Sequence, residues 1–155
     1  MFDPHKPKYH DLYWKMAWAA AQQSQARRHK VGAILVTPTG MISVGWNAMP
    51  AGMDNDCEYW DEALGRYKTK PEVVHAERNA IDKMTRQGVP TCGSVLFVTR
   101  SPCFECAKAL HGLGIKTIHY AELHDCTGGF EMLRNAGVNL HRCTPPLQGQ
   151  HPIPS

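Results

Sequence analysis

The sequence has no long hydrophobic run, because its longest uncharged apolar stretch, Met16 to Ala21, is far shorter than the ~20 residues that span a membrane. It also has no hydrophobic stretch near its start of the kind found in secretory signals. A strong charge imbalance is missing as well, since the net charge is +3 at pH 7, too small to require a nucleic-acid partner. We therefore expect a cytoplasmic protein that binds neither a membrane nor nucleic acid.

The composition is that of a folded protein. Of the 155 residues, 43% are hydrophobic and 20% are charged, which excludes intrinsic disorder and gives enough chain for one domain with a sizeable core. We expect this domain to span residues 1–143. Residues 144–155 contain four prolines and are predicted to form an irregular tail.

Six cysteines could form three disulfides, but a reducing compartment disfavours them. Cys103 and Cys106 have C-x-x-C spacing, which is typical of a metal site or a redox pair. The other four are predicted to be small buried hydrophobic residues: Cys57, Cys92, Cys126 and Cys143.

The apolar pattern predicts five strands, at residues 31–36, 41–46, 94–99, 116–120 and 138–141. It predicts helices over residues 11–28, 74–87, 102–112 and 130–135, the last ended by Gly137. Asp11 is the expected N-cap of the first helix, whose buried face would carry Leu12, Met16, Ala19 and Ala20. The long connection over residues 47–71 is predicted to contain a short helix at 60–67. This order predicts an α/β fold, a three-layer α/β/α sandwich around a five-stranded mixed sheet that is mostly parallel, with an antiparallel hairpin at one edge.

Two short motifs, each at the start of a predicted helix, carry the chemistry. Cys103 and Cys106 are three positions apart, so both thiols fall on one face of a first helical turn, where Pro102 fits the first helical position. The positive end of a helix lowers thiol pKa values and favours the thiolates that zinc binds. With His75 as a third ligand, the set would leave a fourth position open, as in catalytic zinc sites.

Glu77 distinguishes a catalytic site from a structural one. It lies two residues after His75, close enough to reach a zinc-bound water without occupying the metal, and a carboxylate there can shuttle a proton. The pattern H-x-E…P-C-x-x-C is the signature of zinc deaminases that act on nucleobases. A redox pair would leave His75 and Glu77 unexplained, and a purely structural zinc site would have no use for Glu77.

Longer stretches make the resemblance more specific. The chain resembles the cytidine deaminase superfamily, and within it the deoxycytidylate (dCMP) deaminases, over roughly residues 9–142. The matching stretches include residues 31–36, 45–52, 75–81, 98–109, 114–116 and 133–138.

The resemblance implies zinc held by His75, Cys103 and Cys106, with Glu77 moving the proton as water attacks C4 of cytosine and ammonia leaves. The product would be dUMP, a precursor of thymidylate. The residues implied to bind substrate are Asn47 at the sugar, Ala76, Thr99, Ser101 and Pro102 at the base edge, and Arg28 and His124 near the phosphate.

The resemblance also implies control by nucleotides. In the family, dCTP activates and dTTP inhibits through a loop that corresponds to Gly45, Trp46, Asn47, Ala48, Pro50 and Gly52. Mg²⁺ is expected to accompany the triphosphate effector, and the family usually assembles as a homohexamer.

Several positions depart from the family pattern. Trp46 and Ala48 replace a tyrosine and a glycine of the effector loop, which raises the question whether regulation survives, since alanine does not readily adopt positive φ. His124 stands where relatives often carry tyrosine, so dCTP is an alternative substrate beside dCMP. Arg100 replaces an apolar residue, and its role is open. A deaminase of tRNA or another polynucleotide is a further alternative, which the modest charge disfavours.

Overall fold

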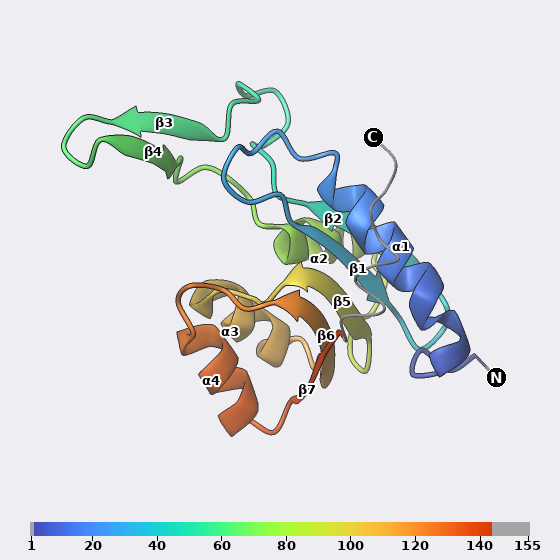
Figure 1. Cartoon of the computed structure of the whole chain (residues 1–155). Helices are drawn as coiled ribbons and strands as arrows, with labels where there is room; N and C mark the ends of the chain where they lie inside the picture. Colours follow the sequence, from blue (N-terminus) through green and yellow to red (C-terminus); the bar gives the residue numbers. More distant parts are fainter. Residues whose placement is uncertain (1, 144–155) are drawn as a thin grey trace.

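A five-stranded mixed sheet forms the centre of the computed structural model, which describes residues 2–143 (Figure 1). Its strands lie in the order β2-β1-β5-β6-β7. Their bounds are β1 Gly32–Val36, β2 Ile42–Trp46, β5 Val95–Arg100, β6 Thr117–Glu122 and β7 Asn139–Arg142. All residues of β1 and β5 are buried, as expected for central strands that are covered on both faces.

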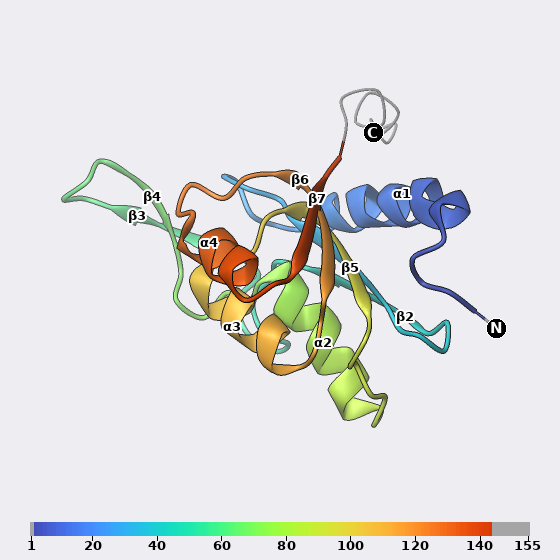
Figure 2. The same cartoon turned by 90° about the horizontal axis from the view of Figure 1, so that it is seen from below.

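Helices cover both faces of this sheet, so the predicted three layers are confirmed (Figure 2). Helix α1 (His10–Ala21), preceded by a short 3₁₀ turn η1 (Pro7–Tyr9), packs on one face. The other face carries α2 (Ala76–Arg86), α3 (Phe104–Gly112) and α4 (Gly128–Asn135). No helix among residues 2–143 has the length and apolar character needed to cross a membrane.

One strand of the sheet, β1, runs opposite to the other four. Strand β1 runs antiparallel to both β2 and β5, whereas β5, β6 and β7 are parallel to one another. The mixed sheet is thus confirmed, and so is its mostly parallel character, because β2, β5, β6 and β7 all run in the same direction; the predicted antiparallel hairpin is formed by β1 and the edge strand β2.

Helix α1 is shorter than predicted, and it buries a different face. It ends at Ala21, Tyr9 rather than Asp11 is its N-cap residue, and Leu12 is half exposed. The buried face consists of Tyr13, Trp14, Ala17, Ala20 and Ala21. After Ala21, backbone groups bind tertiary partners instead of continuing the helix: the Ala26 N–H donates to Ser24 Oγ, and the next two N–H groups donate to Glu58.

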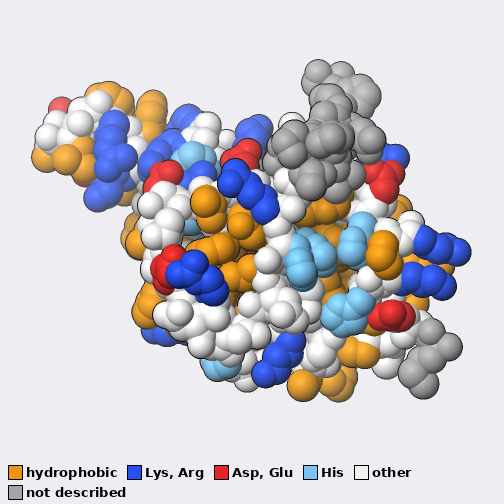
Figure 3. Space-filling view, turned by 60° about the horizontal axis from the view of Figure 1, so that its bottom comes forward, with side chains coloured by type: hydrophobic (Ala, Val, Ile, Leu, Met, Phe, Trp, Pro, Cys, Tyr) orange, Lys and Arg blue, Asp and Glu red, His pale blue; other side chains and the backbone are white. Residues whose placement is uncertain are grey.

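The predicted helix at residues 60–67 is wrong. Residues 58–69 instead form an antiparallel hairpin, β3 (Glu58–Asp61) with β4 (Arg66–Thr69), which projects from the body as an arm (Figures 1 and 2). Gly65, with φ of +61°, permits the turn. Hydrophobic and basic side chains are visible along the arm in Figure 3, and those of Tyr59, Trp60, Leu64 and Tyr67 are exposed.

Two glycines let helices approach the sheet closely. A Cβ on Gly32 would lie 1.9 Å from the Ala17 carbonyl oxygen in α1, and a Cβ on Gly45 would lie 2.2 Å from the Ala76 carbonyl oxygen in α2. Neither approach is compatible with any side chain at the glycine. Gly45 therefore seats the helix that follows His75.

The cysteines outside the C-x-x-C pair fall into two groups. Cys57 and Cys143 are buried as predicted, but Cys92 and Cys126 are exposed, so the expectation for these two is wrong: both lie in loops, beyond the reach of the core. Residues 144–155, the predicted tail, lie outside the described part of the chain.

Candidate metal centre and active site

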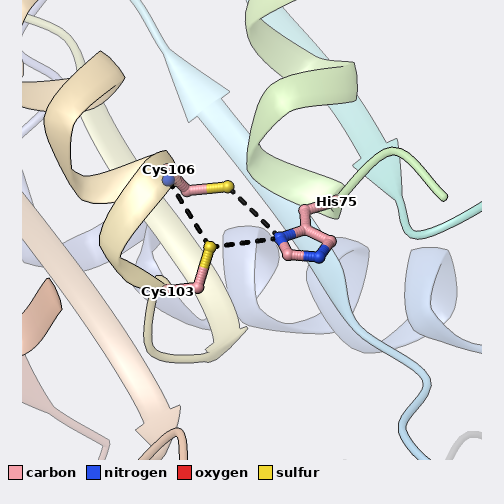
Figure 4. Close-up of side chains that lie close together, drawn as sticks. All are labelled: His75, Cys103 and Cys106. Atoms are coloured by element: carbon pink, nitrogen blue, oxygen red, sulfur yellow. Dashed lines mark hydrogen bonds between the residues drawn. The ribbon is translucent and has the colours of Figure 1, made fainter. Parts of the chain in front are cut away.

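Three side chains with metal-binding atoms meet where α2 and α3 begin (Figure 4). The His75 Nδ1 atom lies 3.3 Å from Cys103 Sγ and 3.4 Å from Cys106 Sγ. Among the described residues, this is the one group of three or more histidine, cysteine or acidic side chains with ligand atoms close enough to share a metal ion.

The local sequence explains why the ligands converge. His75 is the N-cap residue of α2 and Cys103 is the N-cap residue of α3, while Cys106 lies in the first turn of α3. Pro102 therefore precedes the cap instead of occupying the first helical position, because the Cys103 sulfur itself accepts from the Cys106 N–H at 3.5 Å. Both helix starts thus aim their ligands at one point.

The distances fit a zinc ion. With Zn–S of about 2.3 Å and Zn–N of about 2.05 Å at tetrahedral angles, sulfur and nitrogen ligands lie about 3.5 Å apart. The observed separations of 3.3 and 3.4 Å are close to this value. Two thiols and one imidazole form a donor set typical of catalytic zinc, with one coordination position left for a small molecule.

Among the three ligands, the electrostatics of Cys103 favour binding of a cation. Hydrogen bonding from Cys106, and then from His75, lowers the pKa of the Cys103 thiol and favours the thiolate. The hydrogen bond with Cys103 raises the pKa of His75, and the nearby Glu77 charge adds to this effect. Thiolates are the form in which cysteine binds metals.

Glu77 is a buried carboxyl group beside these ligands. It lies in the first turn of α2 and is only 3% exposed. Burial raises its pKa to about 7, so the group can both hold and release a proton near neutral pH. A carboxyl group matched to neutral pH within a pocket is typical of a general acid–base.

A pocket of about 610 Å³, open to solvent, connects this centre to the surface. His75, Glu77 and Cys103 lie in its wall, and the base of the β3–β4 arm closes one side through Cys57, Glu58 and Thr69.

The pocket includes four of the seven residues predicted to bind substrate: Asn47, Ala76, Ser101 and His124. Thr99 and Pro102 are buried but do not line it. The Thr99 hydroxyl instead accepts from the Gly32 N–H at 3.1 Å, joining β5 to β1. Arg28 is exposed and does not line the pocket either; its backbone N–H donates to Glu58 Oε2 at 2.8 Å.

Asn47 already makes hydrogen bonds within the protein through both ends of its amide. Its Oδ1 accepts from the Val31 N–H at 2.8 Å, and its Nδ2 donates to the His29 carbonyl at 2.7 Å. Asn47 therefore fixes the chain segment before β1 as part of the pocket wall. The second Nδ2 hydrogen and the second lone pair of Oδ1 are left to contact a ligand.

The predicted effector residues form the end of β2 and the loop that follows. Gly45 packs beneath α2, and the Trp46 ring lies under Lys83 Nζ at 5.1 Å. Ala48 pairs through its backbone with Val74, immediately before His75, and no residue other than glycine has positive φ in the described chain. Ala48 therefore fits this backbone without strain, Pro50 is partly buried, and Gly52 has φ of +85°.

Sequence reasoning assigned no function to three ionisable residues that line the pocket: His29, Glu58 and Arg100. The sequence marks Arg100 only as a departure from the family pattern. A cation at the end of a buried strand, three residues before a metal ligand, is the sequence signal for a role in the site. His29 and Glu58 come from a loop and from the arm, whose approach to the centre no local pattern encodes.

Comparison with known proteins agrees with this geometry. Residues 7–122 match the family model described as the cytidine and deoxycytidylate deaminase zinc-binding region. The chain is 33% identical to the deoxycytidylate deaminase of enterobacteria phage T4, over 81% of this chain and 85% of that protein. It is 32% identical to the deoxycytidylate deaminase of Mus musculus, over 87% of this chain and 79% of that one.

A solved structure shares the fold. The crystal structure of dCMP deaminase from the cyanophage S-TIM5, in complex with dCMP and dUMP, superposes with a TM-score of 0.79 at 37% identity, covering 89% of this chain and 98% of that one. Fold and site define a zinc-binding deaminase-type domain. The chain belongs to the cytidine and deoxycytidylate deaminase family.

Proposed function

We propose that this protein is a zinc-dependent deaminase that converts dCMP and water to dUMP and ammonia. The observation that carries the proposal is the convergence of His75, Cys103 and Cys106 beside the buried Glu77, all reached from one pocket, in a chain of this family. Relatives named for this activity, over most of the chain, support the choice of substrate.

The three ligands would hold the zinc ion. Once bound, zinc lowers the pKa of a coordinated water to about 7 and so makes a hydroxide nucleophile available at neutral pH. The helix starts fix the two thiols and the imidazole.

Glu77 would move the proton. Its carboxyl group accepts a proton from the attacking water and delivers it to N3 of the cytosine ring, then assists the departure of the amino group as ammonia. Burial suits it to this task, because a carboxyl group with a pKa near 7 exchanges protons in both directions at neutral pH.

The pocket walls would hold the nucleotide. The backbone at Ala76 and at Ser101 lies beside the ligands and can bind the polar edge of the base, as the resemblance implies. Asn47 would contact the sugar. Thr99 and Pro102 would act from behind this wall, by fixing the strand and the turn that carry Ser101 and Cys103.

The proposal is tested by measuring ammonia release from the zinc-loaded protein with dCMP, dCTP, deoxycytidine and a short single-stranded oligonucleotide. We expect dCMP to be converted, and dUMP to appear in equal amount. Turnover of dCTP at a comparable rate would identify the alternative with two substrates. Release from the oligonucleotide alone, with zinc bound, would contradict the proposal.

We further propose that dCTP and dTTP regulate the reaction through residues 45–52, with Mg²⁺ beside the triphosphate, in a homohexamer. The backbone pairing of Ala48 with Val74 supports a path from this loop to His75, because displacement of Ala48 would move the residue next to the ligand. Effector-dependent rates and the mass of the assembly in solution test these points. A rate unaffected by either nucleotide would refute the regulation.

A further inference from the structure

Arg100 carries a positive charge into the wall of the pocket. It is the last residue of β5, it is 9% exposed, and it lines the pocket with the metal ligands. A guanidinium stays charged at every physiological pH, so its burial is unfavourable unless an anion accompanies it. This position therefore requires a negative partner.

The partner that the chain itself provides is a weak one. The Arg100 Nη2 atom lies 3.2 Å from Asp125 Oδ2, but the Asp125 side chain is 81% exposed, against 10% for that of Arg100. An ion pair whose acidic member is this exposed contributes little to stability. It also engages one carboxylate oxygen, whereas a guanidinium can bind an oxyanion through two parallel hydrogen bonds.

Two histidines, His29 and His124, line the same part of the pocket as Arg100, and we call these three residues the corner. The Arg100 Nη1 atom lies 3.2 Å from His29 Nδ1. Because a guanidinium can only donate, His29 Nδ1 accepts this hydrogen bond and orients Arg100. Burial, and next the Arg100 charge, lower the pKa of His29. The N–H of Cys126 donates to His124 Nδ1 at 3.0 Å, which leaves the proton of a neutral His124 ring on Nε2 as a donor.

The corner is fixed to the turn that precedes the metal ligands. The His124 N–H donates to Ser101 Oγ at 2.8 Å, and Ser101 directly follows Arg100. A group bound by Arg100 and His124 is thus held at a fixed place relative to Cys103. Glu58, which also lines the pocket, uses its two carboxylate oxygens to accept the backbone N–H groups of residues 27 and 28.

We propose that Arg100, oriented by His29 and joined by His124, recognises the 5′-phosphate of the nucleotide, and that Asp125 holds its place until the phosphate displaces it. A phosphate carries nearly two charges and three acceptor oxygens, so it outcompetes a single exposed carboxylate. The proposal rests on the proposed function and deepens it: Arg100, rather than Arg28, selects nucleotides over nucleosides.

The test compares kcat/KM for dCMP and for deoxycytidine, which lacks the phosphate, in the zinc-loaded protein and in Arg100→Gln, Asp125→Asn and Arg28→Gln. The matched control is Arg134→Gln, an arginine that pairs with Glu131 on the exposed side of α4. We expect Arg100→Gln to lose about 100-fold on dCMP, since each hydrogen bond to a charged group is worth roughly tenfold, with deoxycytidine unchanged. Asp125→Asn is expected to lower KM for dCMP by about twofold to fivefold.

Binding of inorganic phosphate, measured by calorimetry on the same zinc-loaded proteins, separates this inference from the proposed function. Phosphate binding that weakens in Arg100→Gln and tightens in Asp125→Asn supports the subsite even if no cytosine compound is converted. Conversion of dCMP with the selectivity unchanged in Arg100→Gln, or lost only in Arg28→Gln, would overturn it. Should Arg100→Gln fail to fold, Asp125→Asn decides alone: unchanged phosphate affinity refutes the displacement and with it the proposal.

Discussion

The floor and the outer wall of the pocket are built in different ways. By the floor we mean the metal centre with Glu77: His75, Glu77 and Cys103 line the pocket, and Cys106 completes the metal centre. All four are placed by the first turns of two helices that pack on the sheet. The wall consists of loop segments and the base of an arm, joined by side chains such as Glu58 and Arg100 that bridge from one segment to another. The backbone fixes the floor, whereas the wall depends on individual polar contacts.

This difference separates two kinds of chemistry. A zinc ion and a proton carrier require ligand positions held to within fractions of an ångström, which helix starts provide. Recognition of a particular substrate depends on which charges and donors line the wall, and loops can change these without disturbing the fold. Changes to the floor should therefore alter kcat, and changes to the wall should alter KM and substrate choice.

The largest effect is expected at the floor. Cys106→Ser removes one of the two thiolates and should weaken zinc binding by more than the ~10–100-fold typical of losing a residue that only supports a ligand. Ammonia release should then fall to the background rate. Elemental analysis of zinc per chain and a turnover assay measure both. Cys92→Ser is the control, because Cys92 is exposed and outside the pocket; equal zinc in both variants would contradict the assignment.

Two glycines, each packed against a different helix, test whether the position of α2 matters for the floor. Gly45→Ala would push against α2, which follows His75, and Gly32→Ala would push against α1, which carries none of the floor residues. Both should lose about 1–3 kcal/mol or more of unfolding free energy, because a methyl group does not fit. In the fraction that remains folded, Gly45→Ala alone should lower kcat. Urea titration and turnover per folded molecule test this, and equal kcat values would show that the floor tolerates movement of α2.

Glu58 tests the wall. Its carboxylate is 3% exposed and accepts the N–H groups of Arg27 at 2.7 Å and Arg28 at 2.8 Å. Glu58→Gln replaces one acceptor oxygen by a donor. It should lower the free energy of unfolding by about 1.5–3 kcal/mol, which is the contribution of one hydrogen bond to a charged group. KM for dCMP should rise while kcat changes little. A fall in kcat with KM unchanged would place Glu58 in the reaction itself.

A stack of rings on the α1 face lies apart from both regions. His119 lies between Phe97, with ring centroids 4.5 Å apart, and His141, at 5.0 Å, while His10 contacts it edge-on. A group of histidine side chains is visible on one face in Figure 3. Burial lowers the pKa of His119 to about 3, and the neighbouring histidines His10, His141 and His5 add to the shift.

The smallest effect is expected for this stack of rings, as a change in the free energy of unfolding at acidic pH. Because the folded pKa lies below the unfolded value of about 6.5, the unfolded chain binds the proton first, and stability falls as the pH drops from about 6.5 toward 3. His119→Phe keeps the stack and should lose less unfolding free energy between pH 7.5 and pH 5 than the parent chain. Urea midpoints at the two pH values measure this. An identical loss in both chains would show that His119 does not contribute.

The floor could be read from the sequence because its signals are local. His75 and Glu77 are two residues apart, and the two cysteines are one helical turn apart, so spacing places each pair at one helix start. That the two pairs meet is predicted by the deaminase signature that they form together. The five strands follow from runs of buried β-branched and aromatic residues, and their predicted bounds differ from the observed ones by one or two residues.

The wall could not be read in this way, because its contacts join segments far apart in the chain. The hydrogen bonds from Arg27 and Arg28 to Glu58 span about thirty residues, and they also explain why the first helix ends at Ala21 instead of continuing to Arg28. The predicted helix at 60–67 is a hairpin because Trp60 and Tyr67 pair across two strands, with their ring centroids 5.3 Å apart.

The most direct test of the account is made at Glu77. Ammonia release from dCMP and zinc content should be measured side by side in the zinc-loaded parent chain and in Glu77→Gln. If Glu77 moves the proton, the variant keeps its zinc and loses about 10²–10⁴-fold in kcat. A variant that keeps both its zinc and its rate would contradict the assignment of the carboxyl group, and with it the proposed chemistry of the site.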